Sequence, residues 1–163
     1  MPLAYIALGS NLGDRLGQMR EALERLQQYG EVHVLHASSV YQNRAVGMGD
    51  EAGDFLNAVA EVSTVLEPLE LLELCLSVEQ QLGRTRSTEG WASRTIDLDL
   101  LFYEGAEIES QRLTLPHPRI KERDFVAVPL AELAPELEIG GRRLSEIAGK
   151  LCSDELSIYL DKL

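Results

Sequence analysis

The sequence predicts an α+β fold in which one antiparallel sheet carries two helices on one face. The first observation is the order of apolar patterns, which alternate between strand-like runs and helical spacing as β-α-β-β-α-β. The second is length: 163 residues fit one domain, and no repeat or linker divides them. The third is composition, since 45% hydrophobic and 26% charged residues are typical of a globular chain that buries its own core.

The first half of the chain supplies the pattern β-α-β-β. Residues 4–8 form an apolar run, and GSNLGD over 9–14 is predicted to be a capped turn from strand to helix. Residues 14–29 place apolar side chains at helical spacing until Gly30. Residues 32–41 and 55–65 are predicted strands, and the glycine-rich residues 43–54 form the loop between them.

The second half completes the pattern. Pro68 suits the first turn of a helix, whose apolar stripe ends at Gly83. A polar loop over 84–93 leads into a strand over 95–103, and Glu104 and Gly105 suggest a hairpin turn into residues 106–109. Prolines after position 115 suggest short helices and loops. Together these elements predict a ferredoxin-like βαββαβ sandwich with a C-terminal hairpin and short-helix extension. We expect a single domain over residues 1–163. This fold alone decides no function.

Charge and composition exclude several classes of protein. The net charge of −12 disfavours nucleic-acid binding, although residues 84–123 hold seven basic and seven acidic residues against eight and twenty elsewhere. No apolar run is long enough to span a membrane, and no basic leader is visible. Cys75 and Cys152 lack metal-ligand spacing and are predicted to be free thiols. We therefore expect a cytoplasmic protein that binds an anion near residues 84–123.

The sharpest chemical signal is the pair Asp97 and Asp99. Alternate side chains of a strand share a face, so both carboxylates point one way while Leu98 points into the core. Two carboxylates about 7 Å apart repel by about 2 kcal/mol at an effective dielectric constant near 20. A bridging divalent cation would remove that repulsion, and Mg²⁺ prefers such oxygen ligands. The alternative is the solvated outer face of an edge strand that binds nothing.

Basic residues surround this pair in the sequence. Arg84 and Arg94 precede it, and Arg112, His117 and Arg123 follow it. Guanidinium groups bind phosphates, and acidic metal ligands flanked by arginines are typical of phosphoryl transfer. The alternative for each of them is an ordinary surface charge, which is equally favoured for Arg112, whereas a functional role is favoured for Arg84 and Arg94 beside the aspartate strand. Neither the P-loop motif nor the dinucleotide-binding glycine motif is present.

Phe55 and Asn57 suggest a second site. An aromatic ring and an amide at alternate strand positions could stack on a flat heterocycle and hydrogen-bond its edge. Asparagine is uncommon inside a strand, so Asn57 requires an explanation. The alternative is that Asn57 only satisfies nearby backbone groups.

Six blocks of the sequence, spread over nearly the whole chain, resemble one known family: the 6-hydroxymethyl-7,8-dihydropterin pyrophosphokinases of folate biosynthesis. The blocks are YIALGSNLG (5–13), FLN (55–57), GRTR (83–86), WASRTIDLDLL (91–101), PHPR (116–119) and ERDFV (122–126). The resemblance implies an enzyme that transfers pyrophosphate from ATP to the pterin hydroxymethyl group and releases AMP.

The resemblance also implies roles for the matching residues. Two Mg²⁺ ions would be held by Asp97 and Asp99, and Arg84 and Arg94 would stabilise the phosphates in the transition state. ATP would be bound by Glu79, Arg84, Trp91, Arg94, Arg112, Thr114, His117 and Arg123. The pterin would be bound by Asn43, Val46, Gly47, Phe55, Asn57 and Phe125, with its ring between the two phenylalanines.

Two other functions are compatible with the residues alone. A Mg²⁺-dependent nucleotidyl transferase or phosphohydrolase could use the same aspartate pair, and would release pyrophosphate or phosphate. A non-catalytic ferredoxin-like module would need neither aspartate. The expected partners are ATP and the pterin only, without nucleic acid or membrane. A monomer is expected because no unusually apolar stripe is left exposed.

Overall fold

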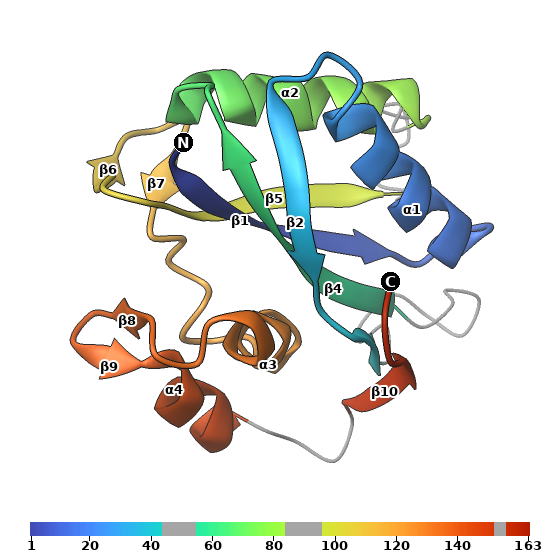
Figure 1. Cartoon of the computed structure of the whole chain (residues 1–163). Helices are drawn as coiled ribbons and strands as arrows, with labels where there is room; N and C mark the ends of the chain where they lie inside the picture. Colours follow the sequence, from blue (N-terminus) through green and yellow to red (C-terminus); the bar gives the residue numbers. More distant parts are fainter. Residues whose placement is uncertain (44–54, 84–95, 152–155) are drawn as a thin grey trace.

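The chain folds around one antiparallel sheet. A computed structural model describes residues 1–43, 55–83, 96–151 and 156–163. Figure 1 shows β1 (Leu3–Ser10), α1 (Arg15–Leu26), β2 (Val32–Ala37), β3 (Val40–Asn43), β4 (Phe55–Thr64), α2 (Pro68–Gln81) and β5 (Asp97–Tyr103). In sheet order β5 lies beside β1 and β1 beside β4, while β2 and β3 both pair with the other edge of β4. Every one of these pairs is antiparallel, and the strand order is that of the predicted ferredoxin-like fold.

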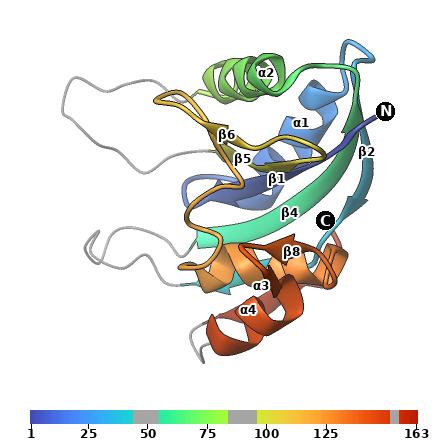
Figure 2. The same ribbon diagram turned by 90° about the vertical axis from the view of Figure 1, so that its left-hand side faces the viewer.

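Helices cover both faces of the sheet (Figure 2). The face under α1 and α2 buries residues such as Ile6 and Leu98. The opposite face buries Tyr5, Val59 and Leu101 beneath α3 (Asp124–Leu133) and α4 (Leu144–Leu151). We predicted helices on one face and only short helices after position 115, so this second layer extends the prediction. It is required because the central strands are apolar on both sides.

The strand predicted over 32–41 is divided into β2 and β3 at Ser38 and Ser39. The Ser38 amide donates to the Val59 carbonyl oxygen at 2.8 Å, and the Ser38 hydroxyl accepts the Val59 amide at 2.9 Å. One serine side chain therefore replaces a ladder hydrogen bond at this point. The break lets the two strands follow the twisted edge of β4 separately.

The turn predicted at Glu104 and Gly105 is present, but the hairpin predicted with it is wrong. Gly105 has φ +78°, and the Ala106 amide donates to the Tyr103 carbonyl at 3.0 Å. The next strand, β6 (Ile108–Glu109), pairs with β7 (Thr114–Leu115) instead of with β5. The outer edge of β5 is used by other groups, which belong to the site described below.

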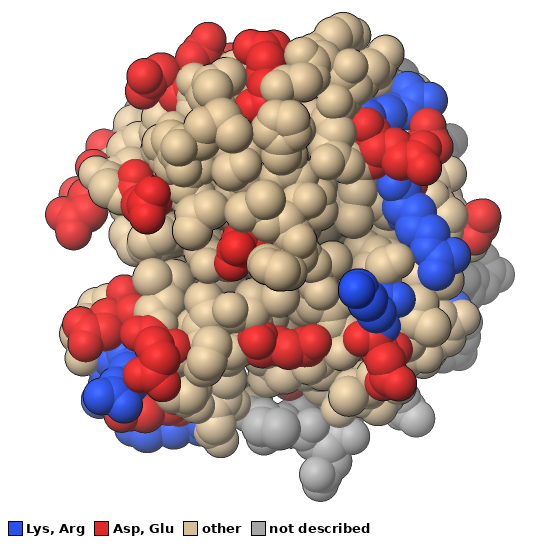
Figure 3. All heavy atoms as spheres, in the orientation of Figure 1, with Lys and Arg blue, Asp and Glu red and all other residues tan. Residues whose placement is uncertain are grey.

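The remaining elements lie at the C-terminal end of the chain. They are a small hairpin of β8 (Glu138–Ile139) and β9 (Arg142–Arg143), and β10 (Ser157–Leu160), which pairs with β3. Over the described residues, no helix is long and apolar enough to cross a membrane. Acidic side chains are spread over the face seen in Figure 3, with basic ones near α1 and β9, in keeping with the net charge of −12.

Candidate active site

A row of four residues crosses the sheet and forms the floor of the site. Asn57 lies opposite both Tyr41 and Gly9, and Gly9 lies opposite Asp97. Paired residues point to the same side, here the side on which Val59 packs beneath α3. Gly9 has no side chain, so no side chain of β1 stands between Asn57 and Asp97 in this row. These two residues are two strand spacings apart, about 10 Å.

The aspartate pair lies at the edge of this floor. Asp99 lies opposite Ala7 and Asp97 opposite Gly9, so both half-buried carboxylates share one face, as the strand alternation predicted. They line a pocket of about 300 Å³. The pocket brings together six predicted residues from four segments of the chain: Glu79, Asp97, Asp99, Arg112, Thr114 and His117.

Glu79 fixes the strand that carries the pair. Its side chain is only 2% exposed, and Glu79 Oε1 accepts a 2.9 Å hydrogen bond from the Leu98 amide. Leu98 lies between the two aspartates, so this charge-assisted bond from α2 holds β5 on the side away from β1. Cys75, on the same helix, has its pKa raised to about 12 by burial and, secondarily, by the negative charge of Asp99.

The donor set fits a hard divalent cation. Two carboxylates on one face, beside an open pocket, leave most coordination positions to water and phosphate oxygens, as Mg²⁺ prefers. Across the described parts of the chain, no group of three or more His, Cys, Asp or Glu side chains is arranged to hold a metal. The arrangement is thus suited to a metal that arrives with a phosphate ligand, and it is unlike a closed structural site.

His117 enters the pocket from a distant segment. Its amide donates to the Leu101 carbonyl at 2.8 Å, at the point where the register between β1 and β5 shifts. Its Nδ1 accepts the Arg119 amide at 3.1 Å, which leaves the proton on Nε2. Burial lowers the pKa of His117, and the charges of Arg123 and Arg119 lower it further. The ring is therefore neutral at pH 7 and can donate a hydrogen bond from Nε2.

Arg112 and Arg123 lie at two different boundaries of the site. The exposed Arg112 side chain forms an ion pair with Glu73 at the rim of the pocket. Arg123 is the residue that precedes α3, and its guanidinium carbon lies 5.6 Å from the centre of the Phe125 ring. The cation is thus attracted to the ring face.

The predicted ring-binding residues converge from three elements. Asn43 ends β3 and lies opposite Phe55, which begins β4. The Asn57 amide donates to Asn43 Oδ1, so its partner is a side chain and not the backbone. Asn57 is 7% exposed. Phe125, in the first turn of α3, packs on the core that α3 shares with this face of the sheet.

Comparisons with known proteins identify the family. The model of the family "7,8-dihydro-6-hydroxymethylpterin-pyrophosphokinase (HPPK)" matches residues 5–135. The chain belongs to this family. Two proteins named 2-amino-4-hydroxy-6-hydroxymethyldihydropteridine pyrophosphokinase are similar to it. The protein of Bacillus subtilis is 48% identical over 83% of this chain and 80% of its own length. The protein of Methylorubrum extorquens is 45% identical over 93% of this chain and 94% of its own length.

The fold is also found in solved structures. A Plasmodium falciparum HPPK-DHPS chain, solved with SDX-DHP, superimposes with a TM-score of 0.71 at 13% identity. The present chain is covered to 96% in that alignment but spans only 48% of the other chain. This likeness shows a shared fold and confirms the predicted fold class.

Several predicted HPPK residues lie outside the described residues, namely Val46, Gly47, Arg84, Trp91 and Arg94. One residue of the floor was missed in the sequence. We predicted that the GSNLGD segment is a turn with a cap, and Asp14 does cap α1 by accepting the Gly17 amide at 3.1 Å. Gly9, however, belongs to β1 and to the row between Asn57 and Asp97. The available signal was a glycine at the end of an apolar strand, which marks close approach of another group.

Proposed function

We propose that this chain is an ATP-dependent pyrophosphokinase of folate biosynthesis that acts on 6-hydroxymethyl-7,8-dihydropterin. The hydroxymethyl oxygen attacks the β-phosphorus of ATP, the bond to the α-phosphate oxygen breaks, and AMP leaves with the electron pair. The hydroxyl proton passes to solvent. One observation carries this assignment: a glycine, Gly9, lies in the row between an amide suited to a ring edge, Asn57, and a carboxylate suited to a metal, Asp97.

Asp97 and Asp99 are proposed to hold two Mg²⁺ ions at the edge of the floor. The metal supplies charge neutralisation for the triphosphate and polarises the attacked phosphorus. Glu79 keeps both aspartates in register through the Leu98 amide. The pocket is adjacent to both carboxylates, which leaves room for phosphate oxygens.

The nucleotide is proposed to lie along the pocket between α2 and β7. Neutral His117 donates from Nε2 to a phosphate or ribose oxygen, and Thr114 lines the same wall. Arg112 closes the rim, and Glu79 lies at the inner end. Arg123 reaches the phosphates from the start of α3. We assign transition-state stabilisation to Arg84 and Arg94, with Trp91 also on the nucleotide, by their match to the family motif.

The pterin is proposed to lie over Gly9, with its ring between Phe55 and Phe125. Asn57 reads the ring edge, and its hydrogen bond to Asn43 fixes which way the amide faces. The hydroxymethyl group then points along the row toward Asp97. Backbone groups of Asn43, Val46 and Gly47 complete the ring pocket by their position in the family resemblance, although Asn43 stands where the family usually has threonine.

The test is a single reaction with separated nucleotide products. Protein, ATP, Mg²⁺ and 6-hydroxymethyl-7,8-dihydropterin are incubated, and nucleotides are resolved by chromatography, with a control lacking the pterin. We expect AMP that depends on the pterin, with no ADP. Release of pyrophosphate or of ADP and phosphate would instead support a nucleotidyl transferase or phosphohydrolase and overturn the proposal.

We further propose that the chain acts as a monomer in the cytoplasm on small-molecule substrates. All predicted site residues come from one chain, so the site needs no second copy. Light scattering after gel filtration should then give a mass near the chain's 18.1 kDa.

A further inference from the structure

The C-terminal end of α3 is joined to the break between β2 and β3 by a polar cluster, the Glu132 cluster, formed by Glu132, Ser39 and Tyr41. Glu132 Oε1 accepts the Ser39 amide at 2.9 Å and lies 2.9 Å from the Ser39 hydroxyl. Glu132 Oε2 accepts the Tyr41 hydroxyl at 2.7 Å. Ser39 and Tyr41 are buried, with 8% and 9% of their surfaces exposed. One carboxylate thus gathers donors from two residues of the sheet edge.

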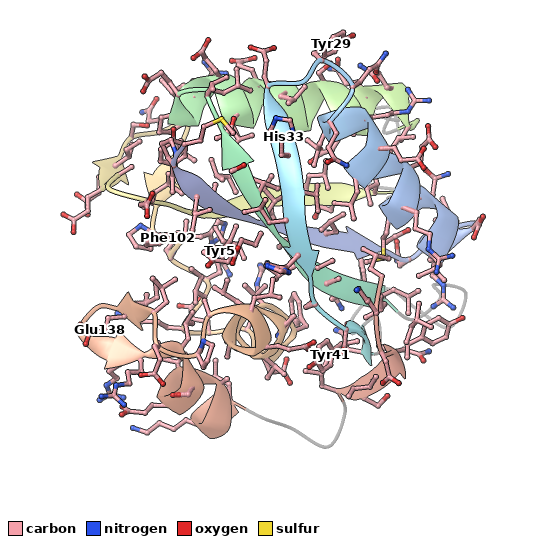
Figure 4. The ribbon with its side chains drawn as sticks, in the orientation of Figure 1. Tyr5, Tyr29, His33, Tyr41, Phe102 and Glu138 are labelled. Atoms are coloured by element: carbon pink, nitrogen blue, oxygen red, sulfur yellow. The ribbon has the colours of Figure 1, made fainter. Side chains whose placement is uncertain are left out.

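The same cluster reaches the end of the chain. The Ser39 hydroxyl lies 2.9 Å from the Asp161 carbonyl oxygen, immediately after β10, and its single proton can go to that oxygen or to Glu132. β10 pairs with β3. The carboxylate therefore lies where α3, the β2–β3 break and the C-terminal strand meet. In Figure 4, Tyr41 lies at the foot of β3 beside α3 and β10.

The strand side of the cluster leads directly to the ring site. Tyr41 is the row neighbour of Asn57 and comes two residues before Asn43. Alternate residues share a face, so Tyr41 and Asn43 both face α3. Any shift of Tyr41 therefore moves the Asn43–Asn57 pair, whose hydrogen bond orients the amide.

On α3, Glu132 is likewise linked to the ring site, because the same helix carries Phe125. Phe125 precedes Glu132 by seven residues, or two turns of α3, so the two lie on one side of the helix about 10 Å apart along its axis. A tilt of about 3° at the Glu132 end displaces Phe125 by roughly 0.5 Å over that length. Binding sites tolerate only about 0.5 Å of such error.

Apolar packing holds α3 on the sheet without directional contacts. Val126, Ala127 and Leu130 hold α3 on the sheet through buried contacts, which are not directional. Hydrogen bonds to an ionised carboxylate are short, strong and directional, and Glu132 accepts them on both of its oxygens. The cluster adds the orientation that the apolar contacts lack.

We infer that Glu132 is a positioning residue for the pterin: it fixes α3 relative to β3, and with them the width of the slot between Phe125 and the Asn43–Asn57 pair. The inference rests on the proposed function. Glu132 touches neither substrate in this assignment, so its effect is confined to the ring half of the site. The nucleotide residues on β5 and α2 have their own tether at Glu79.

The test compares Glu132→Gln with Glu136→Gln in steady-state kinetics. Glutamine keeps the size of the side chain but replaces one carboxylate oxygen by an amide NH2 group, which is a donor that faces either the Ser39 or the Tyr41 donors. We expect the KM for the pterin to rise about tenfold, as for a displacement of a fraction of an ångström, while the KM for ATP changes less than about twofold. Glu136 pairs with Arg143 on the surface just after α3, so its variant should match wild type.

Tyr41→Phe tests the link itself. It removes one hydrogen bond to Glu132 and keeps the ring, so we expect a smaller rise in the pterin KM, about threefold. The double variant should be no worse than Glu132→Gln alone, because both changes break one link. A rise in both KM values together, or a loss of thermal stability with unchanged pterin KM, would assign Glu132 a purely structural role and overturn the inference.

A second readout separates this inference from the proposed function. In NMR spectra without substrates, Glu132→Gln should shift the side-chain amide signals of Asn57 and the ring signals of Phe125, whereas Glu136→Gln should not. Absence of pterin-dependent AMP in the wild type would refute the proposed function without affecting this result. Unshifted Asn57 and Phe125 signals would refute the positioning role whatever the activity.

Discussion

The two halves of the active site are built in different ways. The phosphate half centres on one strand, β5, where the alternation of side chains and the register with β1 place Asp97 and Asp99 together. The ring half joins the end of β3, the start of β4 and the first turn of α3, which carry Asn43, Asn57 and Phe125. Local strand geometry places the aspartate pair at the centre of the first half, and tertiary packing assembles the second.

The halves also differ in what they expose. The aspartates are half-buried at a sheet edge beside an open pocket, where solvent and a cation can reach them. Asn57 is buried in the sheet and satisfied by another side chain. Changes in the phosphate half should therefore alter catalysis with little effect on folding, while changes in the ring half should alter substrate affinity and packing together.

The largest expected effect is in the phosphate half. Asp97→Asn keeps the shape of the side chain and removes one metal-binding charge, so kcat/KM should fall on the order of a thousandfold, comparable with loss of an electrostatic stabiliser. Steady-state assays would measure kcat/KM, and a thermal melt would measure the melting temperature. The melting temperature should change little, because Asp97 is half-buried and asparagine keeps the shape of its side chain.

Glu109→Gln provides the matched control, since it removes one exposed carboxylate from β6. It should leave kcat/KM unchanged. Near-normal turnover in Asp97→Asn at saturating Mg²⁺ would show that the half built on β5 is not the metal site.

Phe125→Ala should have the next largest effect, and that effect should be confined to the ring half of the site. Loss of one stacking ring costs about 1–3 kcal/mol, so the KM for the pterin should rise about ten- to a hundredfold while the KM for ATP stays within about twofold. Phe102→Ala is the control. Its ring packs 6.1 Å from that of Tyr5 on the same core, so it should lower stability without the selective rise in pterin KM (Figure 4). Equal kinetic effects of both variants would contradict a role for Phe125 in ring binding.

Gly9→Ala tests the floor between the two halves. A Cβ at Gly9 would lie 3.3 Å from Asn57 Oδ1, close enough to displace the amide and narrow the floor. Overpacking of this kind costs about 1–3 kcal/mol, so we expect a rise of about tenfold in the pterin KM. Gly149→Ala, where nothing lies within 4 Å of the added carbon, should behave as wild type. Unchanged pterin binding in Gly9→Ala would place the pterin away from the floor.

The same division explains what could be predicted from the sequence. The shared face of Asp97 and Asp99 follows from strand alternation, because two residues on one strand need no tertiary information. Of the slot formed by Asn43, Asn57 and Phe125, the local pattern suggested only Asn57. The other two residues were predicted from a family resemblance. The layer that carries Phe125 was predicted as short helices and loops, since Pro129 interrupts the helical pattern of α3.

Two further features depend on contacts between distant segments. Ser38 breaks a predicted strand because its hydroxyl takes over a ladder hydrogen bond with Val59, which no local pattern indicates. Glu132 is one of 27 acidic residues, and nothing in its neighbours suggests that it accepts hydrogen bonds from Ser39 and Tyr41, more than 90 positions earlier. Hydrogen bonds of this range are decided by packing and not by sequence period.

His117 belongs to the phosphate half, but a tertiary contact places it, since its amide donates to the Leu101 carbonyl. Burial and the charges of Arg123 and Arg119 hold its pKa below the ordinary 6.5. An NMR titration should therefore find its midpoint below 6.5, and bound Mg-ATP should raise it, since nearby phosphate charge favours the protonated ring.

The same shift fixes the sign of a pH effect on stability. Well above pH 6.5 His117 is neutral in both the folded and the unfolded chain, so there it adds no pH dependence. As the pH falls through and below 6.5, the unfolded chain binds the proton first, and the free energy of unfolding decreases. Denaturant melts of wild type and His117→Asn from pH 8 to pH 5 should show this loss only in the wild type. Parallel curves would mean that the hydrogen bonds at Leu101 and Arg119 hold the ring equally well when it is charged, and that His117 can bind phosphate as a cation.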